Sequence, residues 1–139
     1  FGATHTISPG GDAIKEIFEY TNGVGVDYAF EVVGNGKLVE QCVKATRKHG
    51  TVVMVGVGAL DDKFSVRSPI LIFTAKTIKG CMYGSVNFKT DFPMYLDLYR
   101  QGKLDLDSLV SQTYTLDEAM KGFEDLEAGV NARGVIVHS

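Results

Sequence analysis

The feature that most constrains the fold is an apolar segment, 51–57, in which every residue except Met54 and Gly56 is β-branched. A strand without polar alternation is covered on both faces, which is typical of parallel sheets flanked by helices. A second strand, 26–33, precedes it, and residues 37–48 between them have apolar positions at helical spacing. Strand, helix and strand joined by short glycine-containing loops predict a βαβ unit, so we expect a parallel α/β fold.

The rest of the chain continues this alternation. Asp12 has the side chain of an N-cap, and Asn22-Gly23 is expected to end the helix that follows it. Gly50 is expected to stop the helix at 37–48, and Thr115 and Glu118 have the spacing of a capping box. We expect further strands at 4–8, 77–83 and 135–137, further helices at 69–76, 90–100 and 115–128 with Ala119, Phe123 and Leu126 facing inward, and a polar loop at 59–67. Together these elements predict one compact α/β unit followed by a tail.

Composition excludes several classes of protein. The chain is 45% hydrophobic and 22% charged, which is too apolar for a disordered segment, and its apolar runs are far shorter than the ~20 residues of a membrane-spanning helix. A net charge of −3 without a basic cluster disfavours nucleic-acid binding. Cys42 and Cys81 lie far apart in apolar runs, as reduced cysteines of a cytoplasmic protein do, and the histidines supply no metal-ligand spacing.

The glycines are the first indication of a site. Sixteen of 139 residues are glycine, about 12% against roughly 7% in average proteins. Five of them follow predicted strands: Gly34, Gly36, Gly56, Gly58 and Gly84. Ligands of open α/β sheets bind at this edge, so these glycines either admit a flat ligand or form tight turns. No G-x-G-x-x-G, phosphate-loop or nucleophile-elbow motif accompanies them.

Four charged groups are candidates for chemistry. Glu31 ends a buried strand, where its carboxylate is either satisfied by helix N-terminal amides or placed at the ligand edge. Arg133 precedes the last strand, and its guanidinium can hold a phosphate through two parallel hydrogen bonds or form a surface ion pair. The acids Asp61-Asp62 and the pair Asp105 and Asp107 are interpreted as solvated surface carboxylates.

Several segments, in order, resemble one family. Residues 25–34, 50–57 and 77–85 resemble the fourth, fifth and sixth strands of the coenzyme domain in zinc-dependent, medium-chain alcohol dehydrogenases. Residues 102–110, the helix from Thr115 and residues 131–136 resemble the family's C-terminal tail. The ending, residues 131–136, resembles the branch that acts on glutathione- or mycothiol-linked formaldehyde and on aryl alcohols more than it resembles the zinc-free quinone reductases.

The resemblance implies an incomplete doubly wound (Rossmann) parallel sheet that lacks its first two strands, with Thr4–Ser8 as the third. Residues 1–84 would form the second half of the NAD-binding domain, and 85–139 a C-terminal segment of the catalytic domain. The chain begins with Phe1 and its first methionine is Met54, so we expect an upstream segment to have been removed or the chain to be a piece of a longer protein. The full-length protein would be a cytoplasmic, NAD-dependent enzyme that transfers a hydride between a primary alcohol and its aldehyde. Its zinc would be bound outside this chain.

Cofactor contacts follow from the resemblance by position. Val33 and Asn35 match the residues that flank the adenine, although the family often has arginine where Asn35 stands. The backbone of Val55, Gly56 and Val57 matches the segment that holds the nicotinamide carboxamide, with the Cys81 carbonyl and the Tyr83 amide as partners. Arg133 matches an arginine that grips the pyrophosphate. No catalytic or metal-ligating residue is assigned to this chain.

The resemblance also implies an assembly and leaves alternatives. Strand 77–83 matches the edge through which family members pair, so we expect a homodimer or homotetramer. We do not expect the chain alone to be a self-sufficient enzyme. Two alternatives stay open. One is a zinc-free NADPH-dependent quinone or enone reductase of the same superfamily, and the other is a non-catalytic nucleotide-binding module complete at this length. The choice between NAD and NADP also stays open.

Overall fold

The chain forms two compact units in the computed structural model, which describes residues 2–8 and 11–138. The N-terminal unit is residues 2–86, and the C-terminal unit begins at Asn87. The expectation of one compact unit with a tail is therefore wrong, because the residues from Asn87 onward make most of their contacts with one another. None of the described helices combines the length and the apolar character needed to cross a lipid bilayer.

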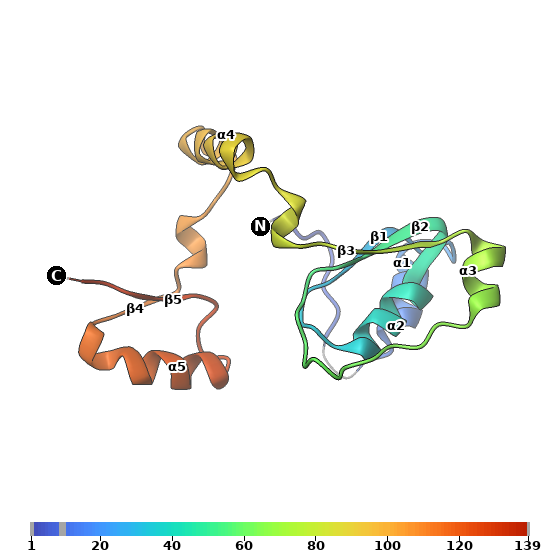
Figure 1. The fold of residues 1–139 in the computed structure, drawn as a ribbon, viewed down its shortest axis with the longest axis horizontal. Helices are drawn as coiled ribbons and strands as arrows, with labels where there is room; N and C mark the ends of the chain where they lie inside the picture. Colours follow the sequence, from blue (N-terminus) through green and yellow to red (C-terminus); the bar gives the residue numbers. More distant parts are fainter. Residues whose placement is uncertain (1, 9–10, 139) are drawn as a thin grey trace. The chain divides into compact units, whose positions relative to one another are not determined.

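The N-terminal unit is built on a three-stranded parallel sheet. Its elements are α1 (Ala13–Tyr20), β1 (Val26–Glu31), α2 (Gly36–Ala45), β2 (Thr46–Met54), α3 (Ser68–Thr74), β3 (Thr77–Gly80) and the 3-10 turn η1 (Tyr83–Ser85). The strands pair in the order β1-β2-β3, and α1 and α2 lie on the same face of the sheet (Figure 1). The predicted parallel α/β fold with a βαβ unit is confirmed.

The buried apolar residues described in this unit belong to α2 and β2. Val39 and Val43, one helical turn apart, are buried on α2, and Val52 and Val53 are buried on β2. The helix begins where Asn35 acts as N-cap, its side-chain oxygen accepting a hydrogen bond from the Lys37 amide at 2.9 Å. The predicted N-cap of α1, Asp12, is also confirmed.

The segment Thr4–Ser8 is not a strand, so that prediction is wrong. A strand exists through hydrogen bonds to a neighbour, and this segment pairs with no described strand. The sheet of the N-terminal unit therefore begins at β1.

The joint between α2 and β2 also differs from the prediction. The helix ends at Ala45, because Thr46 turns to an extended conformation and its hydroxyl donates to the Cys42 carbonyl at 2.6 Å. Gly50 lies inside β2 rather than at a helix stop, and the register shift there makes a bulge at His49, whose φ is 59°.

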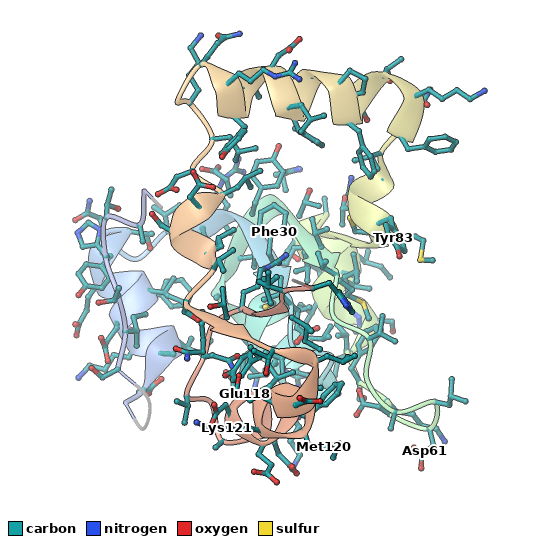
Figure 2. The ribbon with its side chains drawn as sticks, turned by 90° about the vertical axis from the view of Figure 1, so that its left-hand side faces the viewer. Phe30, Asp61, Tyr83, Glu118, Met120 and Lys121 are labelled. Atoms are coloured by element: carbon teal, nitrogen blue, oxygen red, sulfur yellow. The ribbon has the colours of Figure 1, made fainter. Side chains whose placement is uncertain are left out.

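The C-terminal unit contains a second, two-stranded parallel sheet. Its elements are α4 (Phe88–Arg100), the 3-10 turns η2 (Asp107–Leu109) and η3 (Leu116–Glu118), β4 (Gln112–Tyr114), α5 (Ala119–Glu127) and β5 (Gly134–Ile136). The predicted capping box is present, with Glu118 (labelled in Figure 2) accepting from the Thr115 amide. Phe123 and Leu126 are largely exposed, because they border an open pocket beside Tyr114 instead of a closed core.

Candidate functional site

The three strands of the N-terminal unit end at one edge of the sheet. Glu31 is in register with Met54, and Met54 with Gly80. Residues 32–36, 55–58 and 81–85 therefore leave the sheet side by side, and we call these residues the carboxyl edge. Parallel sheets bind ligands at such an edge. The edge brings together seven of the eight predicted cofactor contacts: Val33, Asn35, Val55, Gly56, Val57, Cys81 and Tyr83.

Glu31 ties two loops of the carboxyl edge together. The residue is 3% exposed, and its Oε1 accepts hydrogen bonds from the amides of Val33 (2.9 Å), Gly34 (2.8 Å) and Asn35 (3.3 Å). Its own carbonyl oxygen accepts from the amides of Val55 (2.8 Å) and Gly56 (3.0 Å). The carboxylate is thus satisfied by amides that precede α2, and it lies at the ligand edge as well.

The glycines of the carboxyl edge pack one loop directly against the next. A Cβ added to Gly34 would lie 2.5 Å from the Gly58 nitrogen, and one added to Gly56 would lie 2.6 Å from the Val33 carbonyl carbon. Gly34 also has a φ of 89°, which a larger residue tolerates poorly. These glycines therefore serve close contact between two backbones, a role that neither predicted alternative includes.

Asp62 was missed as a structural partner of this edge. Its carboxylate accepts a hydrogen bond from the Gly36 amide at 2.7 Å, so the 59–63 loop is held against the start of α2. Asp62 is an exposed acid, as interpreted, but it also makes this structural contact. The two residues are 26 positions apart, and no local sequence signal joins them.

The remaining surface of the carboxyl edge combines apolar side chains with available backbone groups. Val57 is 89% exposed and Tyr83 is 82% exposed (Tyr83 is labelled in Figure 2), and Val33 is also exposed. The Cys81 amide extends the ladder by donating to the Met54 carbonyl at 2.8 Å. Among the described residues, no backbone hydrogen bond engages the Cys81 carbonyl or the Tyr83 amide. An acceptor and a donor are therefore open to a ligand beside an apolar surface.

Arg133, the eighth predicted contact, belongs to the C-terminal unit. Its side chain is exposed, and the ion pairs found between described residues do not include it. Within the described part of the chain, Arg133 therefore has no acidic partner for the surface ion pair that was the alternative prediction.

Among the described residues, the titratable groups near the carboxyl edge include a protonated thiol and no metal-binding cluster. Burial, with a smaller contribution from the charge of Glu31, raises the pKa of the Cys42 thiol, which keeps it protonated. Among residues 2–8 and 11–138, no group of three or more His, Cys, Asp or Glu side chains is placed to hold a metal ion.

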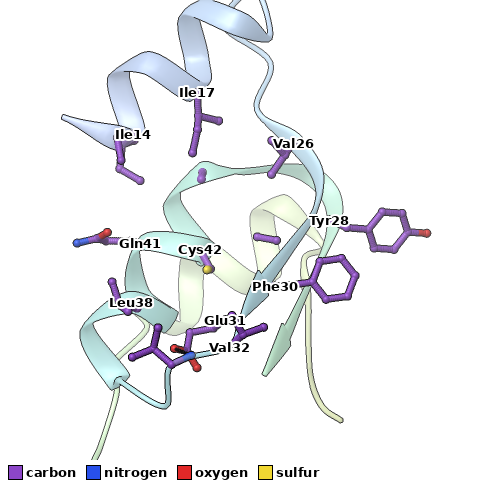
Figure 3. A pocket seen from close by; sticks show the side chains of 14 residues that line it. Ile14, Ile17, Val26, Tyr28, Phe30, Glu31, Val32, Leu38, Gln41 and Cys42 are labelled. Carbon is purple, nitrogen blue, oxygen red and sulfur yellow. Dashed lines mark hydrogen bonds between the residues drawn. The ribbon is translucent and has the colours of Figure 1, made fainter. Parts of the chain in front are cut away.

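An open apolar pocket of about 350 Å³ lies along the free side of β1 (Figure 3). Ile14, Ile17, Leu38 and Cys42 line it from the two helices. Its acidic residue, Glu31, already has its hydrogen bonds within the protein. The pocket is therefore an apolar packing surface and lacks the convergent polar groups of a cofactor site.

Comparison with known proteins identifies the family. A family model described as zinc-binding dehydrogenase matches residues 1–101. The NDMA-dependent alcohol dehydrogenase of Amycolatopsis methanolica is 38% identical over 144 residues, and the S-(hydroxymethyl)glutathione dehydrogenase of Paracoccus denitrificans is 32% identical over 146 residues. Each alignment covers 99% of this chain.

Solved structures agree with this result. The crystal structure of benzyl alcohol dehydrogenase from Acinetobacter calcoaceticus matches with a TM-score of 0.92 at 32% identity, covering 99% of this chain and 38% of that one. The chain spans 38% and 39% of the length of the two relatives named above. The resemblance to zinc-type alcohol dehydrogenases is confirmed, and the chain belongs to the zinc-binding dehydrogenase family.

Proposed function

We propose that this chain supplies part of the NAD-binding site of an alcohol dehydrogenase. The full-length protein would transfer a hydride between a primary alcohol and its aldehyde. The observation that carries the proposal is the carboxyl edge, where Glu31 and the glycine contacts hold two loops in one arrangement beside backbone groups that make no backbone hydrogen bond to the described residues. The relative from Amycolatopsis methanolica and the solved structure from Acinetobacter calcoaceticus are alcohol dehydrogenases, which favours this chemistry over other uses of a nucleotide.

The residues of the carboxyl edge suit the two ends of the cofactor. Val33 offers an apolar surface to the adenine, and Asn35 lies beside it at the start of α2. The Cys81 carbonyl would accept a hydrogen bond from the nicotinamide carboxamide, and the Tyr83 amide would donate one to it. The backbone of 55–57, fixed by Glu31, would hold the same group. Bound NAD supplies the hydride acceptor, and the protein's part is to orient its ring.

The two units would have different roles. We propose that residues 1–84 belong to the coenzyme-binding domain and 85–139 to the catalytic domain, with Arg133 reaching the pyrophosphate. The zinc implied by the family's description has no fitting set of ligands among the described residues, so we assign no step to it.

A charge placed on the carboxyl edge tests the proposal. In the complete polypeptide that carries this sequence, Val57→Glu should weaken NADH binding at least about tenfold, since a carboxylate there would repel the cofactor's phosphates and disrupt its apolar contact. Val24→Glu is the matched control, because Val24 is also an exposed valine but precedes the opposite end of β1. The measurement is a titration of NADH fluorescence.

Equal affinities of the two variants and the unmodified protein would contradict a cofactor site at this edge. Metal analysis of the same preparation separates the alternatives. Stoichiometric zinc supports an alcohol dehydrogenase, and its absence favours a zinc-free quinone or enone reductase.

A further inference from the structure

The backbone of Arg133 is held by the side chain of one residue, Ser111. The Ser111 hydroxyl accepts hydrogen bonds from the amides of Ala132 (2.9 Å) and Arg133 (3.2 Å), and it donates to the Arg133 carbonyl (3.3 Å). The Ser111 amide donates to the same carbonyl at 3.1 Å. A serine hydroxyl has one donor and two acceptor positions. All three are used on residues 132 and 133.

The residues on both sides of this segment are fixed as well. Asn131 is 8% exposed, and its Nδ2 donates to the Tyr114 hydroxyl at 2.9 Å. The Tyr114 hydroxyl in turn donates to Asp125 of α5 at 2.8 Å. Gly134 begins β5 opposite Gln112, and a Cβ there would lie 2.7 Å from the Tyr114 ring. The chain from 131 to 134 is therefore anchored to β4 and α5.

The Arg133 side chain, by contrast, is unengaged. No hydrogen bond or ion pair to its guanidinium occurs among residues 2–8 and 11–138. A planar guanidinium that has no carboxylate partner and projects from an anchored backbone can hold a phosphate oxyanion through two parallel hydrogen bonds. Pre-organisation of this kind lowers the conformational entropy lost on binding.

We propose that Ser111 is a positioning residue for Arg133. Its hydroxyl sets the backbone from which the guanidinium grips the pyrophosphate of NAD. The inference rests on the proposed function, in which Arg133 makes that contact. It predicts that Ser111 affects cofactor binding only through Arg133.

A double-mutant cycle tests this dependence in the complete polypeptide. Titration with NADH should give a dissociation constant about fivefold higher for Ser111→Ala, the size expected from losing one or two net hydrogen bonds. Ser111→Thr keeps the hydroxyl and should bind within about twofold of the unmodified protein. Once Arg133→Ala is present, adding Ser111→Ala should change the dissociation constant no further. Nicotinamide riboside, which has no phosphate group, should bind all variants equally.

Thr113→Ala is the matched control, because Thr113 is an exposed hydroxyl residue of β4 whose side chain makes no hydrogen bond to the described residues. Additive effects of Ser111→Ala and Arg133→Ala would overturn the proposal. The proposal would also be overturned if Ser111→Ala lowered the melting temperature but left the dissociation constant for NADH unchanged. If Arg133→Ala itself leaves NADH affinity unchanged, the pyrophosphate role of Arg133 fails. That outcome is distinct from one in which Arg133→Ala weakens binding and Ser111→Ala does not.

Discussion

Glu31 stabilises two loops of the candidate site, because its side-chain carboxylate and its backbone carbonyl both accept hydrogen bonds. Its carboxylate binds the amides that lead into α2, and its carbonyl binds the amides that follow β2. A buried carboxylate is stable only when hydrogen bonds replace water. Because the donors here are backbone amides of the carboxyl edge, satisfying this charge also shapes the proposed cofactor site.

Two substitutions of Glu31 should separate the contribution of its hydrogen bonds to stability from the contribution of its charge. Glu31→Ala removes the acceptor of three amides and should lower the free energy of unfolding by about 3 kcal/mol. Glu31→Gln keeps a side-chain oxygen and should cost about 1 kcal/mol. Urea denaturation of the complete polypeptide measures both values. Equal losses for the two variants would show that the hydrogen bonds to Oε1 contribute little.

The close backbone contacts at Gly56 predict that an added methyl group is tolerated there less well than at Gly80. Gly56→Ala should destabilise the protein by at least about 2 kcal/mol and weaken NADH binding, because the new Cβ would force the Gly34 loop away. Gly80→Ala is the control at the end of the neighbouring strand, since a Cβ added there would meet nothing within 4 Å. Thermal melting and NADH titration compare them, and similar behaviour would refute the loop-packing role.

At the scale of elements, Tyr114 connects the two-stranded sheet of the C-terminal unit to α5. It ends β4, is buried, and donates its hydroxyl proton to Asp125 on the helix. Burial, together with this hydrogen bond, raises the pKa of the Tyr114 phenol. The contact between strand and helix therefore depends on a proton that the folded protein retains.

This pKa predicts loss of stability in alkali. The folded state binds the phenol proton more tightly than the unfolded chain, so the stability that it contributes is complete below about pH 10 and declines as the pH rises above that value. Tyr114→Phe should be less stable near pH 8 but should lose less on raising the pH. Urea denaturation at several pH values measures the difference. A constant gap between the two proteins would contradict the prediction.

At the scale of the whole molecule, one face of the three-stranded sheet is not covered by α1 or α2. Tyr28 and Phe30 point to the side of β1 away from these helices (Figure 3), and they are 63% and 60% exposed. Val32 beyond them is exposed as well. An apolar surface at the free side of a strand promotes association.

The 139-residue chain by itself should therefore self-associate. Sedimentation velocity at about 50 μM should show species larger than a monomer, and the double variant Tyr28→Thr, Phe30→Thr should reduce them while keeping β-forming residues. Phe73→Ser is the control, because Phe73 is also exposed but lies on α3. A monodisperse monomer of the unmodified chain would contradict this prediction.

The pattern of residues predicted the type of nearly every element but few of its limits. The apolar run of 51–57 predicted a strand correctly, yet β2 begins at Thr46 because a bulge at His49 and Gly50 extends the pairing. Thr4–Ser8 has strand-like residues but no neighbouring strand among the described residues. Strand formation depends on a partner, and local propensity does not reveal one.

The sequence by itself determined the parallel α/β class, the helix caps at Asp12, Thr115 and Glu118, and the family, because these depend on local spacing and on ordered motifs. Only the tertiary structure decided what Asp62 and Ser111 do, and it showed that both predicted alternatives for Glu31 hold together. Asp62 accepts from the amide that begins α2, Ser111 accepts from the amides of a turn, and each contact spans more than 20 residues of chain. Such contacts are made by the path of the backbone in space, which residue spacing does not encode.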